Sequence, residues 1–413
     1  MDVSAHPTAL IVFAIVYGAM AMGHLPGLRV DRTGAALIGA LALIATGAIS
    51  AQAAWNAIDY RTIGLLFGLM IVSSAFVVSG FYAWAAARVA TLEVGPPTLL
   101  AVLIGTSAVL SSLLTNDVVV VAMTPLLVAV TLARGLNPVP FLLGFCFAAN
   151  TGSVATIIGS PQNMIIAQGL HLSFVGFTAV TILPALISLP IVWGLLALLY
   201  RSRWRLDPAP APTGAPPPVS VDHWESAKAA VIALGVIAAF VLTDWPREQV
   251  ALGAGGVLLL NRTISSTDML KQVDGNLILL LIGLFIVNAA LAQTGLPQTL
   301  IADLRAEGVD LRHPMWLLVV SAAVSNIVGN NPTVMLLVPY VAGAEPNAAG
   351  AALALGTGFS SNLVVFGSLA GIIVVEAAAK QGIRISFGEF ARAGGWVALI
   401  TMGLAVAWIL VLG

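Results

Sequence analysis

The residues best suited to chemistry in this chain are polar side chains that interrupt long apolar stretches. LLTNDVVVVAMTPLL places Thr115, Asn116 and Asp117 in one stretch, and SNIVGNNPTVMLLVP places Asn330 and Asn331 in another. An asparagine amide offers donors and an acceptor without a formal charge, so it can hold a cation or donate to an anion. We therefore predict that these asparagines contact a transported solute or ion. The alternative is that they only satisfy backbone groups freed at a bend.

Asp117 is the sharpest single candidate. Between Glu93 and Arg201, the only residues with full charges are Asp117 and Arg134. A carboxylate inside a membrane costs about 2.5–3.5 kcal/mol on insertion scales, so it is expected to be paired, protonated or functional. We predict that Asp117 couples transport to protons or cations. The alternative is a structural carboxylate that caps nearby amides.

Two further interruptions lie in the segments GSPQN (159–163) and SNLVVFGS (361–368). Pro161 removes a backbone hydrogen bond, and a helix broken near the midplane exposes a positive and a negative end, which suit an anion and a cation. Close packing of small residues is the alternative role for the glycines and serines. The full predicted substrate- and ion-binding set is Thr115, Asn116, Asp117, Gly159, Ser160, Gln162, Asn163, Asn330, Asn331, Ser361, Asn362, Gly367 and Ser368.

The composition indicates what positions these residues. With 59% hydrophobic and 8% charged residues among 413, the chain has too few polar groups to cover a water-soluble surface. Apolar stretches of about 20 residues, long enough to cross ~30 Å of hydrocarbon, recur along it. We predict an all-α polytopic membrane protein. No cleavable signal is expected, because MDVSAHPT lacks a basic region.

Charge and cysteine content exclude several classes of function. The net charge of -1 argues against nucleic acid as a partner. A single cysteine, Cys146, excludes a disulfide framework and a multi-thiolate metal site. No nucleophile and base pair or metal cluster is visible, so we expect no enzyme, no metal site and no cofactor beyond a coupling ion, H⁺ or Na⁺.

The chain divides into two halves that resemble each other. The Pro-rich segment 201–228 predicts a linker between a first repeat, 1–200, and a second, 229–413. DYRTIGLLFGLMIVSSAFVVSGF realigns with DGNLILLLIGLFIVNAALAQTGL at an offset of 215, and SAVLSSLLTNDVVVVAMTP realigns with SAAVSNIVGNNPTVMLLVP at 214. The second alignment places Asp117 on Asn331. Internal repeats of this kind are typical of secondary transporters.

Each half is predicted to contain a re-entrant helical hairpin and a discontinuous helix. The hairpins are expected at about 99–133 and 315–341, and the broken helices at about 138–168 and 350–380. Irregular backbone at membrane depth is tolerated only where it is buried in protein or lines a wet cavity. These segments should therefore enclose one central site.

Basic residues predict the orientation of the halves, because short cytoplasmic loops collect Lys and Arg. If the linker 201–228 is cytoplasmic, Arg29, Arg32, Lys271, Lys380 and Arg392 are cytoplasmic too, whereas Arg61, Arg247, Arg305 and Arg312 are not. Corresponding points of the halves are then separated by an odd number of crossings. The repeats are therefore expected to be inverted in a multi-pass protein of the inner (plasma) membrane.

These motifs resemble the ion transporter superfamily, and within it the arsenite-efflux (ArsB-type) and related anion permeases; the sodium-coupled divalent-anion symporters are more distant relatives. The resemblance rests on the two asparagine motifs, ATIIGSPQNMI, and SNLVVFGSLAGIIVVEAAAKQGIRISFGEFARAG. It implies a scaffold and a transport domain, elevator-type motion and a homodimer, with a soluble ATPase subunit as a further candidate partner. It places Thr115, Asn116 and Asp117 at a hairpin tip where the symporters have Ser-Asn-Thr.

We predict that the chain exports arsenite or antimonite in exchange for protons, with Asp117 as the coupling carboxylate. The sequence shows almost no cationic side chains in the core, which favours an uncharged solute over a dianion. The alternatives are a sodium-coupled symporter of an inorganic or carboxylate anion, a sodium/proton antiporter and, from another class, an ion channel.

Overall fold

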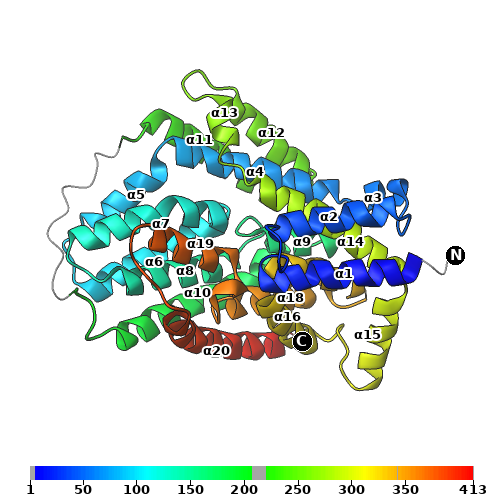
Figure 1. Cartoon of the computed structure of the whole chain (residues 1–413). Coiled ribbons are helices and arrows are strands. Elements are labelled where there is room, and N and C mark those ends of the chain that lie inside the picture. The colour runs from blue at the N-terminus through cyan, green and yellow to red at the C-terminus, as the bar shows by residue number, and fades with distance from the viewer. Residues whose placement is uncertain (1–4, 207–219, 342, 413) are drawn as a thin grey trace.

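The computed structural model describes residues 5–206, 220–341 and 343–412, which form an all-α polytopic membrane protein without a strand in those ranges (Figure 1). The first half contains α1 (Ala5–Met22), α2 (Arg32–Ala45), α3 (Ala51–Ala57), α4 (Tyr60–Val78), α5 (Phe81–Ala90), α6 (Pro96–Leu113), α7 (Asn116–Ala133), α8 (Pro138–Ser153), α9 (Pro161–Gly169) and α10 (Phe174–Leu199).

The second half repeats this order of long and short helices. It contains α11 (His223–Leu242), α12 (Arg247–Leu259), α13 (Ser266–Leu270), α14 (Gly275–Gln293), α15 (Leu296–Ala306), α16 (Pro314–Val328), α17 (Asn330–Leu337), η1 (Val338–Tyr340), α18 (Pro346–Ser360), η2 (Val365–Gly367), α19 (Leu369–Lys380) and α20 (Phe387–Leu412).

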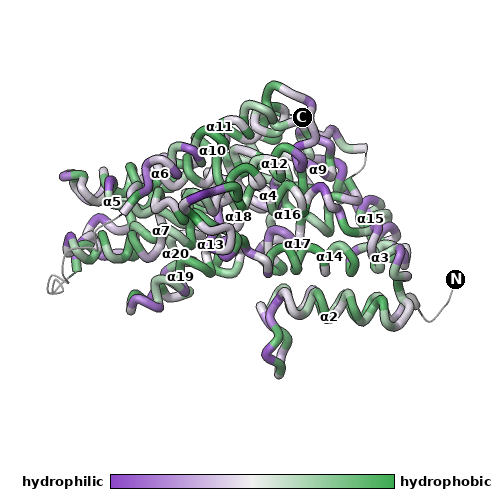
Figure 2. The backbone as a smooth tube through the Cα atoms, turned by 90° about the horizontal axis from the view of Figure 1, so that it is seen from above, coloured by the Kyte–Doolittle hydropathy of each residue, from purple (hydrophilic) through white to green (hydrophobic). Residues whose placement is uncertain are grey.

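The long helices are apolar enough to cross a bilayer. Seven helices within the described ranges have both the length and the composition of a membrane span: α4, α6, α7, α10, α11, α14 and α20. Figure 2 shows hydrophobic residues along most of the helices, with hydrophilic residues gathered at turns and ends. The chain is therefore a multi-pass integral membrane protein.

Matching residues of the two halves begin matching helices. The Asp59 side chain accepts hydrogen bonds at the start of α4, and Asp274 does the same at the start of α14. Gly80 and Gly295 precede α5 and α15 with φ values of 78° and 75°, a left-handed conformation that favours glycine. The aligned sequences therefore form the same local structures.

Helices of the two halves also pack on each other reciprocally. Helix α2 packs on α14 and α12 packs on α4, while α7 packs on α19 and α17 packs on α9. Gly68 lies against the backbone of Ala251, and its counterpart Gly283 lies against the backbone of Ala36. Only glycine allows such close helix contact, so each half contributes the same close contact to the other.

Four breaks in the helices position the site. Residues 114–115 separate α6 from α7, and Gly329 separates α16 from α17 with a φ of 93°. Residues 154–160 separate α8 from α9, and 361–368 separate α18 from α19, with only the short η2 between. Each break is followed by the start of a new helix, and residues at the starts of α7, α9, α17 and α19 line one cavity.

Candidate functional site

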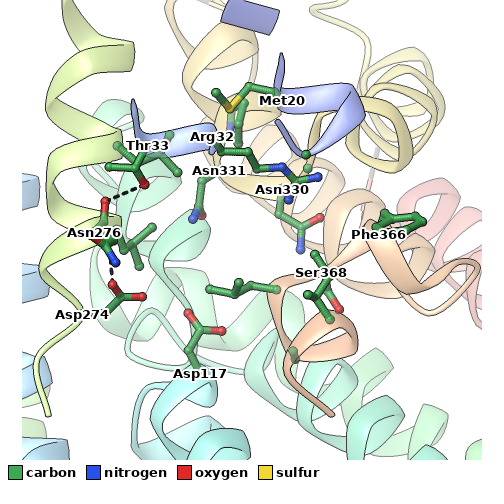
Figure 3. Close-up of a pocket in the computed structure, with 18 of the residues that line it drawn as sticks. Met20, Arg32, Thr33, Asp117, Asp274, Asn276, Asn330, Asn331, Phe366 and Ser368 are labelled. Atoms are coloured by element: carbon green, nitrogen blue, oxygen red, sulfur yellow. Dashed lines mark hydrogen bonds between the residues drawn. The ribbon is translucent and has the colours of Figure 1, made fainter. Parts of the chain in front are cut away.

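A cavity of about 570 Å³ lies where six helices begin, namely α2, α7, α9, α14, α17 and α19 (Figure 3). Helix starts carry partial positive charge and unsatisfied N–H groups, so they attract electron-rich atoms. The polar and charged side chains of its lining are Asp31, Arg32, Thr33, Asn116, Asp117, Gln162, Asp274, Asn276, Asn330, Asn331, Ser368 and Glu376.

The two asparagine motifs meet in this cavity. Asn116 and Asp117 come from the start of α7, and Asn330 and Asn331 come from the start of α17. The Oδ1 atoms of Asn116 and Asn331 are buried and accept no hydrogen bond from any described residue. Because an unpaired buried acceptor costs free energy, both amides favour a ligand that donates hydrogen bonds or a cation.

Asp117 points toward the cavity and is 9% exposed (Figure 3). Its carboxylate makes no hydrogen bond or ion pair within the described part of the chain, so it is not a structural cap in this conformation. Asp274 lies in the same cavity, but its Oδ1 accepts a hydrogen bond of 3.0 Å from the Leu277 amide. Asp117 is therefore the carboxylate left open to a proton or a ligand.

Arg32 is a cationic side chain at the cavity, where the sequence predicted almost none. It lies in the first turn of α2, and its side chain extends over the cavity toward Asn330 (Figure 3). Its Nε atom is buried without a hydrogen-bond partner among the described residues, and no described carboxylate lies within ion-pairing distance. Among the described residues of its lining, the cavity thus presents one unpaired guanidinium opposite the buried, unpaired carboxylate of Asp117.

The carboxylates of the cavity do not form a metal centre. Asp31 caps α2 by accepting from the Gly34 amide at 2.8 Å, and Glu376 is exposed at the rim. In the part of the chain that the structure describes, no three His, Cys, Asp or Glu side chains come together as metal ligands. The site is thus lined by amides, helix starts, the Arg32 guanidinium and carboxylates that do not come together as one cluster of ligands among the described residues.

Comparison with known proteins identifies the family. Residues 8–359 match the profile of a family described as "Citrate transporter" (CitMHS). The chain belongs to the citrate transporter family. Its membership of the ion transporter superfamily confirms the resemblance seen in the sequence motifs.

The chain is similar to one relative over almost its whole length and to another over part of it. A "46 kDa membrane protein" of Mycobacterium leprae is 31% identical over 420 residues, 96% of each chain. The "Silicon efflux transporter LSI3" of Oryza sativa subsp. japonica is 34% identical over 178 residues, 43% of this chain and 36% of its own. The YdaH transporter of Alcanivorax borkumensis shares the fold, with a TM-score of 0.57 and 17% identity over 98% of both chains. The protein is a membrane transporter and not an enzyme.

Several predicted site residues lie behind the transporter's cavity instead of lining it. The Thr115 amide and hydroxyl both lie within hydrogen-bonding distance of the Ser73 hydroxyl, at 3.2 and 3.1 Å. The Asn163 amide donates to the Ser153 and Thr156 carbonyls at 2.8 and 2.9 Å. These groups satisfy the irregular backbone at the breaks.

The remaining predicted residues divide in the same way. Gln162 and Ser368 line the cavity, whereas Gly159, Ser160, Ser361, Asn362 and Gly367 are absent from its lining. The Gly159 carbonyl accepts a hydrogen bond of 3.0 Å from the backbone N–H of Asn116, and the Ser361 hydroxyl donates one of 2.7 Å to the Gly358 carbonyl. Ser160 caps no backbone group, and its buried hydroxyl has no partner among the described residues.

Asn150, which the sequence analysis did not predict as a site residue, connects the break at 361–368 to the first half of the chain. Its side-chain amide donates to the Asn362 Oδ1 and the Ser368 Oγ, both at 3.0 Å. Asn150 is 3% exposed near the end of α8. A polar residue inside an otherwise apolar helix was the available signal, and its role became visible only when α8 met the 361–368 segment.

Proposed function

We propose that the protein is a secondary active transporter that exports arsenite or antimonite in exchange for protons. The observation that carries this proposal is that unpaired acceptors and helix starts share one cavity. The Asn116 and Asn331 oxygens favour a ligand with donors, whereas the six helix starts favour a ligand with lone pairs. A solute whose every oxygen both donates and accepts satisfies both demands.

Trivalent arsenic near neutral pH is mostly an uncharged trihydroxide with three such oxygens. Asp117, Asp274, Asp31 and Glu376 outnumber Arg32 in the lining, which disfavours a polyanion that enters without cations. A small neutral hydroxide avoids this repulsion. Orthosilicic acid has the same chemistry, and a relative carries the name of a silicon efflux transporter, so it is a second solute to test.

Proton exchange follows from the state of Asp117. An ionised, unpaired Asp117 accepts a hydrogen bond from a solute hydroxyl, whereas a protonated Asp117 offers a neutral surface. Solute and proton therefore compete for the same carboxylate. Competition of this kind is sufficient for exchange if only the loaded forms, with solute or with proton, cross the membrane.

An elevator motion is the form of alternating access that we propose. Helices α2 and α14 form one wall of the cavity, and the starts of α7, α9, α17 and α19 form the other. The reciprocal packing of the halves supports inverted repeats, with the hairpins and broken helices as the moving domain. We further propose a homodimer in the inner membrane, with linker 201–228 in the cytoplasm and a soluble ATPase subunit as a further partner.

A sodium-coupled symporter of an inorganic or carboxylate anion is the second candidate. Arg32 favours it, because an unpaired buried guanidinium suits a carboxylate or phosphate. The unpaired amide oxygens at the hairpin tips would then hold sodium, as they would in a sodium/proton antiporter. A channel would need a continuous pore in place of the cavity and would show flux that does not saturate.

Flux into proteoliposomes distinguishes these functions. The solutes are arsenite, antimonite, orthosilicic acid, phosphate and citrate, each with and without a pH gradient and with and without sodium. We expect saturable arsenite or antimonite flux that is driven by a pH gradient and indifferent to sodium. Sodium-dependent uptake of citrate or phosphate, with no flux of the neutral hydroxides, would replace the first proposal with the second.

A further inference from the structure

A second polar cavity, of about 340 Å³, shares no lining residue with the transport site. It is formed where α10 ends and α20 begins, and these two helices pack side by side at the lower edge of the molecule in Figure 1. Its lining consists of Leu199, Tyr200, Arg203, Gly388, Glu389 and Arg392. None of these residues takes part in the transport site.

An apolar groove of about 210 Å³ continues from this cavity between the same helices. Leu199 lines both spaces, and the groove is otherwise lined by leucines of α10 together with Ala393 and Trp396 of α20. Leu198 and Trp396 are 64% and 57% exposed. Both helices are 26 residues long and apolar enough to span a bilayer, so this groove faces hydrocarbon and the polar cavity lies at its end.

The charged residues of the polar cavity leave an excess of positive charge. Tyr200 donates a hydrogen bond of 3.0 Å to Glu389, and burial followed by the Glu389 charge raises the pKa of Tyr200 well above its ordinary value. Arg203 lies 4.8 Å from the centre of the Tyr200 ring and 3.9 Å from the same Glu389 oxygen. Arg392 has no ion-pair or hydrogen-bond partner among the described residues. Two guanidinium groups therefore share one carboxylate.

We propose that these two spaces together bind one anionic phospholipid. The phosphate lies between Arg203 and Arg392, and one acyl chain lies in the groove between Leu195, Leu198 and Trp396. The two spaces match a phospholipid in arrangement as well as in charge. The head group and the acyl chain of a lipid are joined end to end, and the polar cavity and the apolar groove meet in the same way at Leu199. A free phosphate would use the arginines but leave the groove unexplained, and an apolar protein surface would leave Arg392 unpaired.

A lipid bound at this site would stabilise the position of α20, a helix that packs against segments forming the transport site. Phe390 of α20 meets Phe147 of α8 edge to face, with ring centres 5.2 Å apart. Gly394 of α20 lies directly against the Asn362 carbonyl in the break before α19. A lipid that holds α10 to α20 is therefore one helix away from the broken segment, and its binding should raise the melting temperature of the protein.

The test uses the purified full chain in detergent after removal of native lipid. Dioleoyl phosphatidylglycerol, dioleoyl phosphatidylcholine and inorganic phosphate are added separately, and both thermal unfolding and lipid retention in native mass spectrometry are measured. We expect phosphatidylglycerol alone to raise the melting temperature and to stay bound. Equal effects of the two lipids, or the same shift with inorganic phosphate, would overturn the proposal.

Variants separate the head-group contact from general charge. Arg392→Gln and Arg203→Gln should each weaken phosphatidylglycerol binding roughly fivefold, the contribution of one interfacial basic residue. Trp396→Ala should shorten lipid retention while preserving the preference for phosphatidylglycerol. The control is Arg262→Gln, which removes an exposed arginine from the turn after α12. Each variant is compared with its own lipid-free melting temperature, and loss of binding in the Arg262 variant alone would refute the assignment.

Discussion

Replacing Asp117 by asparagine should separate solute binding from proton coupling. The carboxylate is unpaired and opens only onto the cavity. If solute and proton compete for it, solute affinity rises with pH through the titration of Asp117 and levels off above it, because the ionised form accepts the solute hydroxyl. Asparagine keeps the shape and one acceptor but cannot take up a proton in this range.

The structure sets the size of this pH dependence. Asp31 and Asp274 each accept a hydrogen bond from a helix-start amide, at 2.8 and 3.0 Å, and Glu376 is exposed, so Asp117 is the buried carboxylate without a partner among the described residues of the lining. One titrating group changes affinity by at most tenfold per pH unit, the equivalent of about 1.4 kcal/mol. Asp117→Asn should reduce this slope to zero.

The assay measures equilibrium binding of arsenite or antimonite across a pH series and, in parallel, exchange driven by a pH gradient in proteoliposomes. Asp303→Asn, which changes an exposed carboxylate on α15, is the matched control and should behave like the unmodified protein. Gel filtration and thermal unfolding verify that both variants fold. An unchanged pH slope, or proton-driven exchange that survives in Asp117→Asn, would refute the assignment of Asp117 as the coupling group.

Three further substitutions test the packing of α20 and the roles of Arg32 and Asn331 in the cavity. Gly394→Ala forces a methyl group against the Asn362 carbonyl and should destabilise the protein by about 1–3 kcal/mol. The control is Gly403→Ala on the same helix, whose added methyl group meets no atom within 4 Å and should leave stability unchanged. Thermal unfolding of the two variants measures the difference. Arg32→Gln should leave arsenite flux within a few-fold of the unmodified protein, because a neutral hydroxide needs no counter-charge. Abolition of the flux in this variant would favour an anion as the transported solute. Asn331→Asp should add a second titrating group, which would spread the pH dependence of binding over a wider pH range, because two neighbouring carboxylates repel each other and lose their protons in separate steps.

Much of the fold and half of the site could be predicted because both leave local marks in the sequence. Apolar length indicated the spans, and proline, glycine and asparagine inside those spans indicated the breaks. Asn116, Asn331 and Gln162 follow from this logic, because the first residues of a new helix at membrane depth must face a cavity or protein. The sequence therefore located the cavity from its hairpin side.

The opposite wall could not be predicted in this way. Arg32 and Asp274 lie at ordinary helix starts near the predicted membrane surface, where a charged residue needs no special explanation. Only the packing of α2 against α14 places them over the hairpin tips. Conversely, Thr115 and Asn163 carry the same polar signal as the lining residues, yet their side chains form hydrogen bonds behind the cavity, with the Ser73 hydroxyl and the Ser153 carbonyl. The local sequence shows which polar residues lie at membrane depth, but it does not show which way their side chains point.

The internal repeat places one carboxylate and one amide at equivalent positions of the cavity. Asp117 and Asn331 occupy equivalent positions in the two halves, each as the second residue of a helix that begins at a hairpin tip, and both line the cavity. The two side chains have nearly the same shape, but only one can lose or gain a proton. Two carboxylates there would repel each other beside one solute, whereas two amides would leave no titrating group. In the proposed exchange mechanism, one aspartate opposite one asparagine would bind a neutral solute from both sides and couple its release to one proton.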